Sequence, residues 1–316
     1  MTDSPTPRPT LAVTLGDPLG IGAEIVVKAL AQDAAAGADV VLLGDSDVLE
    51  RAVRAEGGTL SCEVRPAPEP GAAAALWALE EACAMVRAGR ADAIVTAPVT
   101  KADIAALSPG FRGQTEFLGG LLGVPRPTMM LAGDHLRVAL VTTHLPLRDV
   151  PDAVTRTAVE RAIRRTHAGL RVWYGIEAPR IAVLGLNPHA GEGGLLGHED
   201  FDEIAPAIAA CRDDGIDCVG PLPGDGTFAP RKRREFDAFV AAYHDQGLAA
   251  LKAVEGGRAV NLSLGLPVPR TSPDHGSARD IAGRGTADPT SMIAAFRLAT
   301  EALSRSSRGN PSHPFA

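Results

Sequence analysis

Several features that define common protein classes are scarce or absent in these 316 residues. Aromatic residues make up only 4% of the chain, and no run reaches the roughly 18 consecutive apolar residues that cross a membrane. The first ten residues lack the apolar core of a secretory signal peptide. The net charge of -7 offers nucleic acids and anionic membranes no overall attraction. We therefore expect a cytoplasmic protein that binds neither nucleic acid nor membrane.

Cysteine is equally sparse, and its spacing matches no metal or redox motif. The four cysteines include no C-x-x-C pair, so reduced thiols of a cytoplasmic protein are their simplest interpretation. The common phosphate motifs are missing as well. The glycine-rich turn at residues 16–22, which follows an apolar strand, matches neither a P-loop nor G-x-G-x-x-G. By itself this turn indicates only a tight connection from a strand to a helix.

The chain does contain a regular alternation of short apolar strands with helical stretches. Predicted strands at residues 40–44 and 93–97 are separated by a long Ala-rich helical stretch at residues 72–88. This alternation predicts an α/β fold with parallel or mixed sheets flanked by helices. A length of 316 residues suggests about two domains, here two lobes around a cleft.

Three of the predicted strands end in a histidine. The apolar run before His189 leads into a loop with three glycines in four positions, and the runs at residues 137–144 and 239–244 end in His144 and His244. Ligands of open α/β sheets bind at the carboxyl ends of the strands, so these imidazoles are expected to converge. Three imidazoles with an open position are the ligand set of a catalytic zinc or similar divalent site. A single histidine after a strand is more often a hydrogen-bonded turn residue than a metal ligand, and the metal interpretation depends on the repeated placement of all three.

Cationic and amide side chains in the final third of the chain favour an anionic ligand. Lys252 lies on the helix after the third histidine, and Asn261 and Arg270 flank a short apolar strand. A point charge, an amide and a bidentate guanidinium together suit a phosphate or a carboxylate. Lys101, directly after a predicted strand, is a further candidate, although most lysines are simply solvated.

Motifs distributed along the chain resemble those of a known enzyme family. They are, in order, G-D-P-x-G-I-G at 16–22, A-P-V-T-K at 97–101, T-T-H-L-P-L-R-D at 142–149, L-N-P-H-A-G-E-G-G at 186–194, Y-H-D-Q-G at 243–247 and a glycine-rich loop at 274–288. Together they resemble the 4-hydroxythreonine-4-phosphate dehydrogenase family of vitamin B6 (pyridoxine) biosynthesis. The last loop is also similar to the adenosine-binding loop of isocitrate and isopropylmalate dehydrogenases.

The resemblance implies a fold like that of isocitrate and isopropylmalate dehydrogenases. One discontinuous lobe is expected to comprise residues 1–112 and 262–316, and the other residues 113–261. A homodimer is also implied, in which three histidines bind one divalent cation, Zn, Mg or Co, at the interface, and one of the three crosses between subunits. These metal ligands are His144, His189 and His244.

The resemblance further implies substrate and cofactor contacts. The residues implied to bind substrate are Gln114, Thr115, Lys252, Asn261 and Arg270. Those implied to bind NAD or NADP are His275, Gly276, Ser277, Ala278, Asp280, Ala282 and Gly283. One position departs from the family pattern, because Gln114 stands where these enzymes typically have a histidine. This departure bears on which substrate is used.

The implied reaction is the NAD-dependent oxidation of 4-phosphooxy-L-threonine at its 3-hydroxyl group, followed by decarboxylation to 3-amino-2-oxopropyl phosphate. A cation held by imidazoles lowers the pKa of the hydroxyl group, and it stabilises the enolate that the loss of carbon dioxide produces. Lys101 and Asp245 are the two candidates for the catalytic group that accepts the hydroxyl proton. Asp245 also suits the orientation of an imidazole or the capping of a turn.

Other functions are weighed against this one. A related enzyme of the same family would oxidise phosphorylated threonate or erythronate, or an unphosphorylated diol dicarboxylate, and Gln114 fits such a changed pocket. A metal-dependent hydrolase, in which the three histidines activate a water molecule, leaves the loop at 274–288 without a role. A non-catalytic binding protein ranks lower still, because the ligand set is intact.

Overall fold

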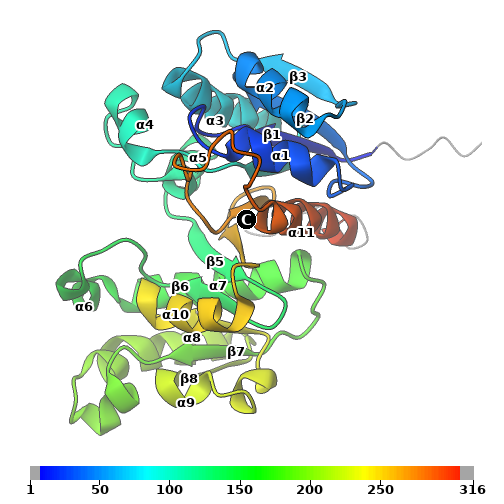
Figure 1. Cartoon of the computed structure of the whole chain (residues 1–316). Helices are drawn as coiled ribbons and strands as arrows, with labels where there is room; N and C mark the ends of the chain where they lie inside the picture. Colours follow the sequence, from blue (N-terminus) through cyan, green and yellow to red (C-terminus); the bar gives the residue numbers. More distant parts are fainter. Residues whose placement is uncertain (1–7, 307–316) are drawn as a thin grey trace, which may run out of the picture. The chain divides into compact units, whose positions relative to one another are not determined.

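The computed structural model describes residues 8–306, which divide into two compact units (Figure 1). The first unit runs to Pro127 and resumes at Leu266, and the second contains residues 128–265. Each unit contributes its own group of neighbouring strands and has its own apolar core. The α/β class predicted from the sequence is confirmed.

The first unit is built on parallel strands. These strands are β1 (Thr10–Thr14), β2 (Asp39–Gly44), β3 (Glu63–Pro66), β4 (Ala93–Thr96) and β11 (Arg270–Pro273). They lie in the order β3-β2-β1-β4-β11, and each neighbouring pair runs parallel. The helices of this unit are α1 (Gly22–Leu30), α2 (Ser46–Glu56), α3 (Ala72–Arg87), α4 (Lys101–Leu107), α5 (Gln114–Leu121) and α11 (Thr290–Ser306).

Both faces of this sheet are covered by helices, as parallel strands with apolar residues on both sides require. Alternate strand residues point to opposite faces. Ala12, Val41 and Ile94 face α3 and share one core with Ala78 and Ala82 of that helix. The small alanine side chains let α3 approach the strands closely. On the other face α1 packs against α2 and α11.

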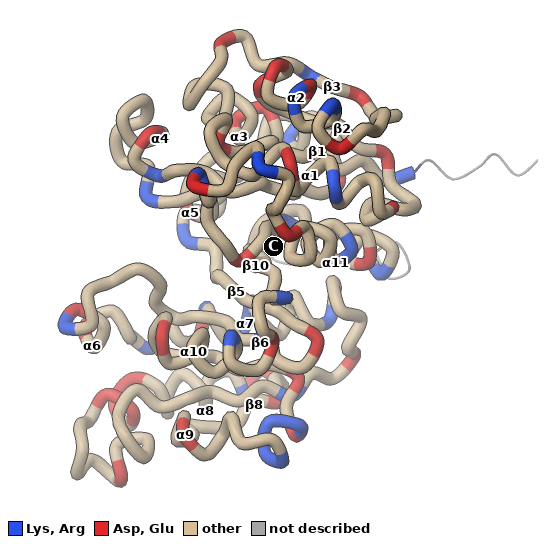
Figure 2. The backbone as a smooth tube through the Cα atoms, in the orientation of Figure 1, with Lys and Arg blue, Asp and Glu red and all other residues tan. Residues whose placement is uncertain are grey.

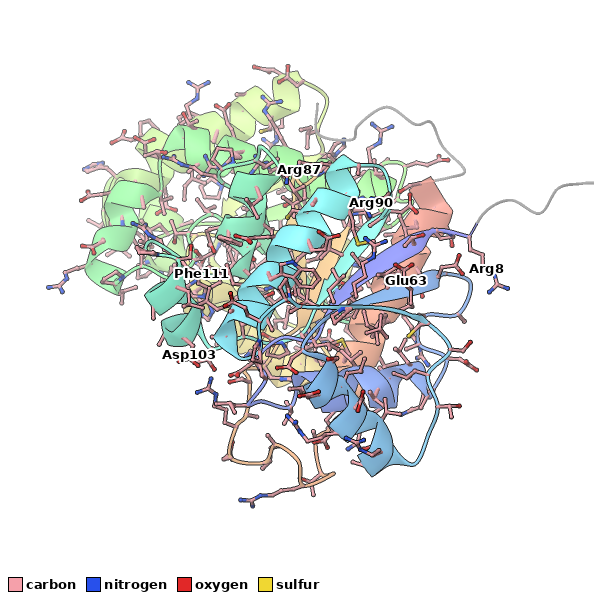
Figure 3. All side chains as sticks on the ribbon, turned by 90° about the horizontal axis from the view of Figure 1, so that it is seen from above. Arg8, Glu63, Arg87, Arg90, Asp103 and Phe111 are labelled. Carbon is pink, nitrogen blue, oxygen red and sulfur yellow. The ribbon has the colours of Figure 1, made fainter. Side chains whose placement is uncertain are left out.

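Helix α5 belongs to the first unit. Phe111, which is labelled in Figure 3, is buried in the core that includes α3. The ring of Phe117 packs against this core, with its centroid 5.3 Å from that of Phe111. Leu118 of α5 is completely buried in the same core. Residues 113–127 are therefore packed into the first unit, which ends at residue 127 and resumes at residue 266.

The second unit has a mixed sheet. Its strands are β5 (Thr128–Ala132), β6 (Arg137–Leu140), β7 (Ile181–Leu184), β8 (Cys218–Leu222), β9 (Ala238–Ala241) and β10 (Val260–Leu264). Within the order β10-β5-β6-β9-β7-β8, the first three strands pair antiparallel and the remaining pairs are parallel. Its helices are α6 (Val150–Ala153), α7 (Arg156–Val172), α8 (Ala205–Asp213), α9 (Gly224–Thr227) and α10 (His244–Glu255).

Helix α10 packs on one face of this second sheet. Leu248 and Leu251 of α10 share a core with Val138, Leu140 and Phe239 of the strands. Helix α7 packs against α8 and contacts strands of the same sheet. Thr155 caps the start of α7, because its Oγ1 accepts the N–H of Ala158 at 3.3 Å. The position of α10 matters for function because the helix begins with His244.

Surface charges and thiols have no unusual features. Lys and Arg residues are interspersed with Asp and Glu along the chain (Figure 2). All four cysteines are free, and burial raises the pKa of Cys83 to about 12 and that of Cys211 to about 11, so both stay protonated at neutral pH. No helix within residues 8–306 is long and apolar enough to cross a membrane.

Candidate active site

Three parallel strands of the second unit deliver the predicted metal-binding histidines to one edge of its sheet. Strands β6, β9 and β7 are neighbours and run parallel, so their carboxyl ends lie side by side. His144 follows β6, His244 follows β9 and His189 follows β7. The rings of His144 and His244 are 5.6 Å apart between centroids, with 42° between their planes. These two imidazoles form a close pair within one chain.

The orientation of His244 is set by its neighbour in the sequence. Nδ1 of His244 lies 2.7 Å from Oδ1 of Asp245, whose side chain is otherwise largely exposed. A carboxylate at Nδ1 keeps the ring proton there and leaves Nε2 with its lone pair, the form that binds a metal. The contact matches the orientation of an imidazole, which is one of the roles considered for Asp245.

Two polar side chains tie the histidine-bearing strand ends together. Gln246 accepts the N–H of Ala242 at 2.7 Å through Oε1, and its Nε2 donates to the carbonyl of Gly185 at 2.6 Å. Thr142 Oγ1 donates a hydrogen bond to the carbonyl oxygen of Ala242 at 2.7 Å. These bonds join the ends of β6, β9 and β7 without using the imidazoles. Sequence reasoning missed Gln246, although its place beside the third histidine was a signal.

His189 lies in a segment with unusual backbone geometry. Residues 189–193 all have positive φ, which is 53° for His189. Because this region is unfavourable for residues other than glycine, surrounding contacts must hold the segment. Asp200, which is 2% exposed, accepts the N–H groups of Leu186 at 2.7 Å and Asn187 at 3.0 Å. Asp200 thus positions the His189 loop, a role that the sequence did not indicate.

The predicted metal set is not complete within one chain. His189 is 65% exposed, and its Nδ1 lies 3.5 Å from Oε2 of Glu192. Among residues 8–306, no three His, Cys, Asp or Glu side chains come close enough to hold a metal ion. A cavity of about 610 Å³ lies beside His189. Its lining includes Asn187, Asp225, Phe228, Tyr243 and Gln246.

A second cluster, in the first unit, surrounds the guanidinium group of Arg270, which is 1% exposed. Nη2 donates to Thr96 Oγ1 at 2.6 Å and to Gln114 Oε1 at 3.1 Å, and Nη1 donates to Thr115 Oγ1 at 3.2 Å. The other end of the Gln114 amide donates to the carbonyl of Ala97 at 3.1 Å. These four side chains, of Arg270, Thr96, Gln114 and Thr115, are named the Arg270 cluster. Sequence reasoning missed Thr96, a polar residue at the end of an apolar strand.

The Arg270 cluster is positively charged at neutral pH. Burial lowers the pKa of Arg270 to about 10, and the nearby carboxylate of Glu116 opposes part of that shift. Lys101, the first residue of α4, lies near Gly113, the residue before Gln114, because its Nζ is 3.8 Å from the position that a Cβ at Gly113 would occupy.

The remaining two predicted substrate residues belong to the second unit. Lys252 is an exposed residue of α10, the helix that begins with His244. Asn261 lies in β10, opposite Leu131 of β5. Its Oδ1 atom is buried and receives no hydrogen bond from residues 8–306. A buried acceptor of this kind suits a donor group on a ligand.

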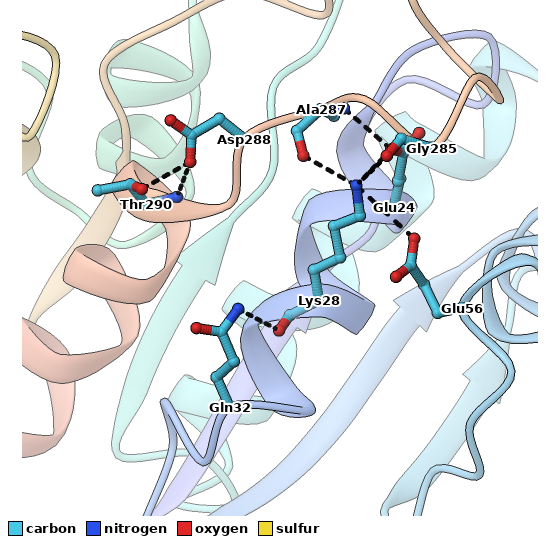
Figure 4. A network of polar contacts seen from close by, with 8 residues as sticks. All are labelled: Glu24, Lys28, Gln32, Glu56, Gly285, Ala287, Asp288 and Thr290. Atoms are coloured by element: carbon cyan, nitrogen blue, oxygen red, sulfur yellow. Dashed lines mark hydrogen bonds and ion pairs between the residues drawn. The ribbon is translucent and has the colours of Figure 1, made fainter.

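The loop predicted to bind the dinucleotide connects β11 to α11 in the first unit. Near its beginning, the carbonyl of Ser277 accepts the N–H of Ile21 at 2.9 Å. Near its end, Lys28 Nζ donates to the carbonyls of Gly285 and Ala287, each at 2.9 Å (Figure 4). The predicted contact residues are partly exposed or exposed: His275, Gly276, Ser277, Ala278, Asp280, Ala282 and Gly283.

The architecture is that of an α/β enzyme, with potential ligand-binding side chains at the carboxyl ends of its strands. The fold is similar to that of isocitrate dehydrogenase from Methylococcus capsulatus, with a TM-score of 0.52, 18% identity, and coverage of 95% of this chain and 87% of that one. Residues 25–299 match the family described as pyridoxal phosphate biosynthetic protein PdxA. The chain belongs to this family, as its motifs predict, and it is an oxidoreductase.

Relatives in sequence and in structure agree with this assignment. A 4-hydroxythreonine-4-phosphate dehydrogenase from Xanthomonas axonopodis pv. citri is 46% identical and covers 94% of this chain and 99% of its own length. The crystal structure of the enzyme of the same name from Klebsiella pneumoniae has a TM-score of 0.83 at 34% identity and covers 95% of this chain and 99% of that one. A terephthalate 1,2-cis-dihydrodiol dehydrogenase from Burkholderia xenovorans, also 34% identical, has a TM-score of 0.67 and covers 92% and 97%.

Proposed function

We propose that this enzyme oxidises 4-phosphooxy-L-threonine at its 3-hydroxyl group with NAD or NADP and decarboxylates the product to 3-amino-2-oxopropyl phosphate, in pyridoxal phosphate biosynthesis. The Arg270 cluster carries this proposal. A buried fork of guanidinium N–H groups, backed by two hydroxyls and an amide, recognises a phosphate or a carboxylate. The name of the 46% identical relative supports the choice of substrate.

The substrate contacts are assigned by the chemistry of each side chain. Arg270, Thr115 and Gln114 bind an anionic group of the substrate. Lys252 adds a positive charge, and the buried Oδ1 of Asn261 accepts a hydrogen bond from a substrate ammonium or hydroxyl group. Both an anion and a donor are present in 4-phosphooxy-L-threonine, so these groups match the proposed substrate.

A divalent cation, zinc, magnesium or cobalt, is assigned to His144, His189 and His244. The residues fit this role, because imidazoles are ligands of such ions and the Asp245 carboxylate at Nδ1 of His244 favours the tautomer whose Nε2 binds a metal. When bound, the cation supplies positive charge that lowers the pKa of the substrate hydroxyl and stabilises negative charge on the neighbouring oxygen as carbon dioxide leaves. The dinucleotide, bound at the 274–288 loop, accepts the hydride.

The protein is further proposed to act as a homodimer, with His189 of the partner subunit completing the histidine set. Large apolar side chains are exposed next to the histidine-bearing strand ends, and a covering subunit would bury them. Leu145 and Leu147, which follow His144, are 44% and 70% exposed. Leu195, which follows His189, is 78% exposed.

Oxidation also requires a group that accepts the hydroxyl proton while the hydride leaves the carbon that bears this hydroxyl group. Lys101 and Asp245 are the two proposed acceptors. Lys101 lies near Gly113, the residue before Gln114, and Asp245 contacts the imidazole of His244. The ketone that forms is β to the carboxylate, so carbon dioxide is lost readily once the resulting negative charge is stabilised.

A second candidate function lies within the same family. A phosphorylated threonate or erythronate, or an unphosphorylated diol dicarboxylate, would offer the Arg270 cluster a similar anion. Gln114 favours this alternative, because its amide contacts Arg270 directly and stands where the family pattern has histidine. The likeness to the terephthalate dihydrodiol dehydrogenase supports the diol substrate in particular.

A cytoplasmic location without nucleic-acid partners completes the proposal. The short basic run at residues 231–234 is partly neutralised within the chain, because Lys232 Nζ lies 2.7 Å from Oε2 of Glu235. Such a patch provides few free charges for phosphate contacts.

The test is the formation of NADH on mixing the metal-loaded protein with NAD and 4-phosphooxy-L-threonine. A rise in absorbance that the His189→Ala variant lacks would support both the substrate and the metal ligand. A rise only with phosphothreonate, phosphoerythronate or a diol dicarboxylate would support the second candidate. No reduction of NAD with any of these substrates would contradict both.

A further inference from the structure

The glycine-rich turn and the first helix hold the loop after β11 at both of its ends. This segment, residues 275–287, is named the dinucleotide loop. At its beginning, Oδ2 of Asp17 accepts hydrogen bonds from Arg279 Nε at 2.7 Å and from Thr100 Oγ1 at 2.5 Å. Thr100 Oγ1 is also 2.9 Å from Ser277 Oγ. Arg279 also donates a hydrogen bond to a second carboxylate, that of Asp103 on α4.

The surroundings of Asp17 favour its ion pair with Arg279. It is 4% exposed, and its Oδ1 accepts the N–H of Leu19 at 3.0 Å, so its carboxylate direction is fixed by its own turn. Burial raises the pKa of Asp17, but the hydrogen bonds from Arg279, Thr100 and Leu19 outweigh burial and leave the pKa below its usual value. Asp17 is therefore charged at neutral pH, where it pairs with Arg279 of the loop.

Gly20 lets the glycine-rich turn lie close to the backbone of the dinucleotide loop. A Cβ at Gly20 would lie 2.6 Å from the carbonyl oxygen of Ser277, so no side chain fits between the turn and the loop. The next residue, Ile21, donates its N–H to that carbonyl at 2.9 Å. The glycine-rich turn thus contacts a protein loop through its backbone, in the way that related turns contact a phosphate.

Helix α1 holds the other end of the loop through a buried ion pair (Figure 4). Lys28, whose side chain is 13% exposed, donates to Glu24 Oε1 at 2.8 Å and to the carbonyls of Gly285 and Ala287 at 2.9 Å each. Glu24 Oε1 also accepts the N–H of Ala287 at 3.1 Å. One Lys–Glu pair therefore satisfies three backbone groups of the loop.

Between these two anchors the dinucleotide loop is largely exposed and forms neither helix nor strand. Ala278 has φ of 42°, which is unfavourable for a residue with a Cβ and requires outside contacts to persist. A loop held at both ends keeps one shape before its ligand arrives, so less ordering entropy opposes binding.

We infer that Asp17 and Lys28 are positioning residues that hold the dinucleotide loop in the conformation that binds NAD. The inference rests on the proposed function, because NAD binding by this loop is itself proposed. It gives the G-D-P-x-G-I-G turn a role that its spacing alone does not reveal. Neither residue needs to contact NAD for this role.

The experiment compares Asp17→Asn and Lys28→Met with the full-length wild-type protein. Asp17→Asn keeps the Oδ1 acceptor for Leu19 but replaces Oδ2, the acceptor for Arg279 and Thr100, with an NH2 group, so the ion pair with Arg279 is lost. The matched control is Asp45→Asn, because Asp45 caps α2 in the same unit by accepting the N–H of Asp47 at 3.0 Å and does not touch the loop. Lys28→Arg keeps the charge and tests rescue.

Three readouts separate positioning from general destabilisation. We expect the dissociation constant of NAD, measured by titration calorimetry without substrate, to rise about tenfold in both variants, as the loss of a charge-assisted hydrogen bond predicts. Hydrogen exchange of the amides of Ile21 and Ala287 should become faster, and KM for NAD should rise while KM for the substrate stays within about twofold. Asp45→Asn should change none of these, and Lys28→Arg should restore part of the affinity.

The outcomes distinguish the two proposals. If the wild type binds NAD and both variants bind it equally well, the positioning role is overturned and the proposed function stands. If the wild type itself does not bind NAD, the proposed function fails and the inference fails with it. If one variant does not fold, as judged by circular dichroism, the other still decides the result, since each removes a separate anchor.

Discussion

The Arg270 cluster and the three histidines differ in what a single chain supplies. The cluster is buried and closed by hydrogen bonds from residues far apart in the sequence, and Arg270 is 1% exposed. The histidines lie on strand ends and loops, where His244 and His189 are 38% and 65% exposed, and no three-residue metal cluster forms within residues 8–306. The Arg270 cluster is therefore formed within one folded chain, whereas the three histidines do not come together within residues 8–306.

This difference suggests separate tasks. A buried guanidinium that is already oriented binds an anion with little reorganisation. Exposed imidazoles on neighbouring strand ends can accept a metal and, in the proposed dimer, a ligand from a second chain. A substitution in the Arg270 cluster should therefore impair only the chain that carries it. A substitution of His189 should impair the metal site of the partner subunit in the proposed dimer.

The largest expected effect comes from removing a metal ligand of the close pair. We expect His244→Ala to lower kcat by about 10³-fold, because the positive charge that assists the reaction is lost. Metal content, measured by plasma mass spectrometry, should fall in parallel. His135→Ala, at an exposed histidine in the turn between β5 and β6, is the control and should keep both. Normal metal content in His244→Ala would contradict the assignment.

A complementation experiment tests whether His189 acts across subunits. His189→Ala and His244→Ala should each be inactive alone. After the two are unfolded and refolded together, half of the dimers are mixed, and each mixed dimer has one intact site, so about a quarter of the wild-type activity should return. If His189 acts within its own chain, no site is restored and the mixture stays inactive.

Substitution of the buried arginine should affect substrate binding within each chain. We expect Arg270→Met to raise KM for the phosphorylated substrate by about 100-fold, because the anion loses its bidentate partner. The control is Arg137→Met in the second unit, where Cζ of Arg137 lies 4.6 Å from the centroid of the Tyr174 ring. Steady-state kinetics with circular dichroism would separate lost binding from lost folding, and an unchanged KM would remove Arg270 from the site.

A smaller effect is expected at the position that departs from the family pattern. Gln114→Glu places a carboxylate against Arg270 and should lower kcat/KM for anionic substrates by about tenfold. Gln114→His restores the family residue and should shift preference towards 4-phosphooxy-L-threonine by a few-fold. Equal preference before and after this substitution, over the substrate panel, would show that Gln114 does not select the substrate.

The smallest effect concerns a charged group that is already paired within the first unit. The pKa of Asp17 is lowered, so its contribution to stability is present above its ordinary pKa near 4 and is lost as pH falls through the folded value. We expect Asp17→Asn to reduce the free energy of unfolding by about 1 kcal/mol at pH 7 and by less near pH 3. Urea unfolding at both pH values measures this, and a difference that grows at low pH would contradict it.

Much of the architecture could be predicted because its signals are local. Apolar runs bounded by glycine and proline mark β6, β7 and β9, and the histidines follow these runs directly. The boundaries of the units could not be placed, because they depend on whether Phe117 and Leu118 find a core beneath α3. That core is formed by residues from several strands, which no single stretch of sequence reveals.

The supporting residues of the site were missed for the same reason. Thr96 lies at the end of a strand, and Asp200 and Gln246 lie in the first turns of two helices, all of which are ordinary positions. Their importance follows from partners that are distant in the sequence, such as Arg270 for Thr96 and Leu186 for Asp200. Hydrogen-bond partners of this kind cannot be inferred from spacing.

By itself the sequence determined the fold class, the family and the candidate histidines, since periodicity and motif order reflect local geometry. Only the tertiary structure decided that His144 and His244 form a pair without His189, and that Arg270 is buried among Thr96, Gln114 and Thr115. It alone decided that the glycine-rich turn holds the dinucleotide loop. The physical reason is that burial and hydrogen bonding depend on contacts between segments that only folding brings together.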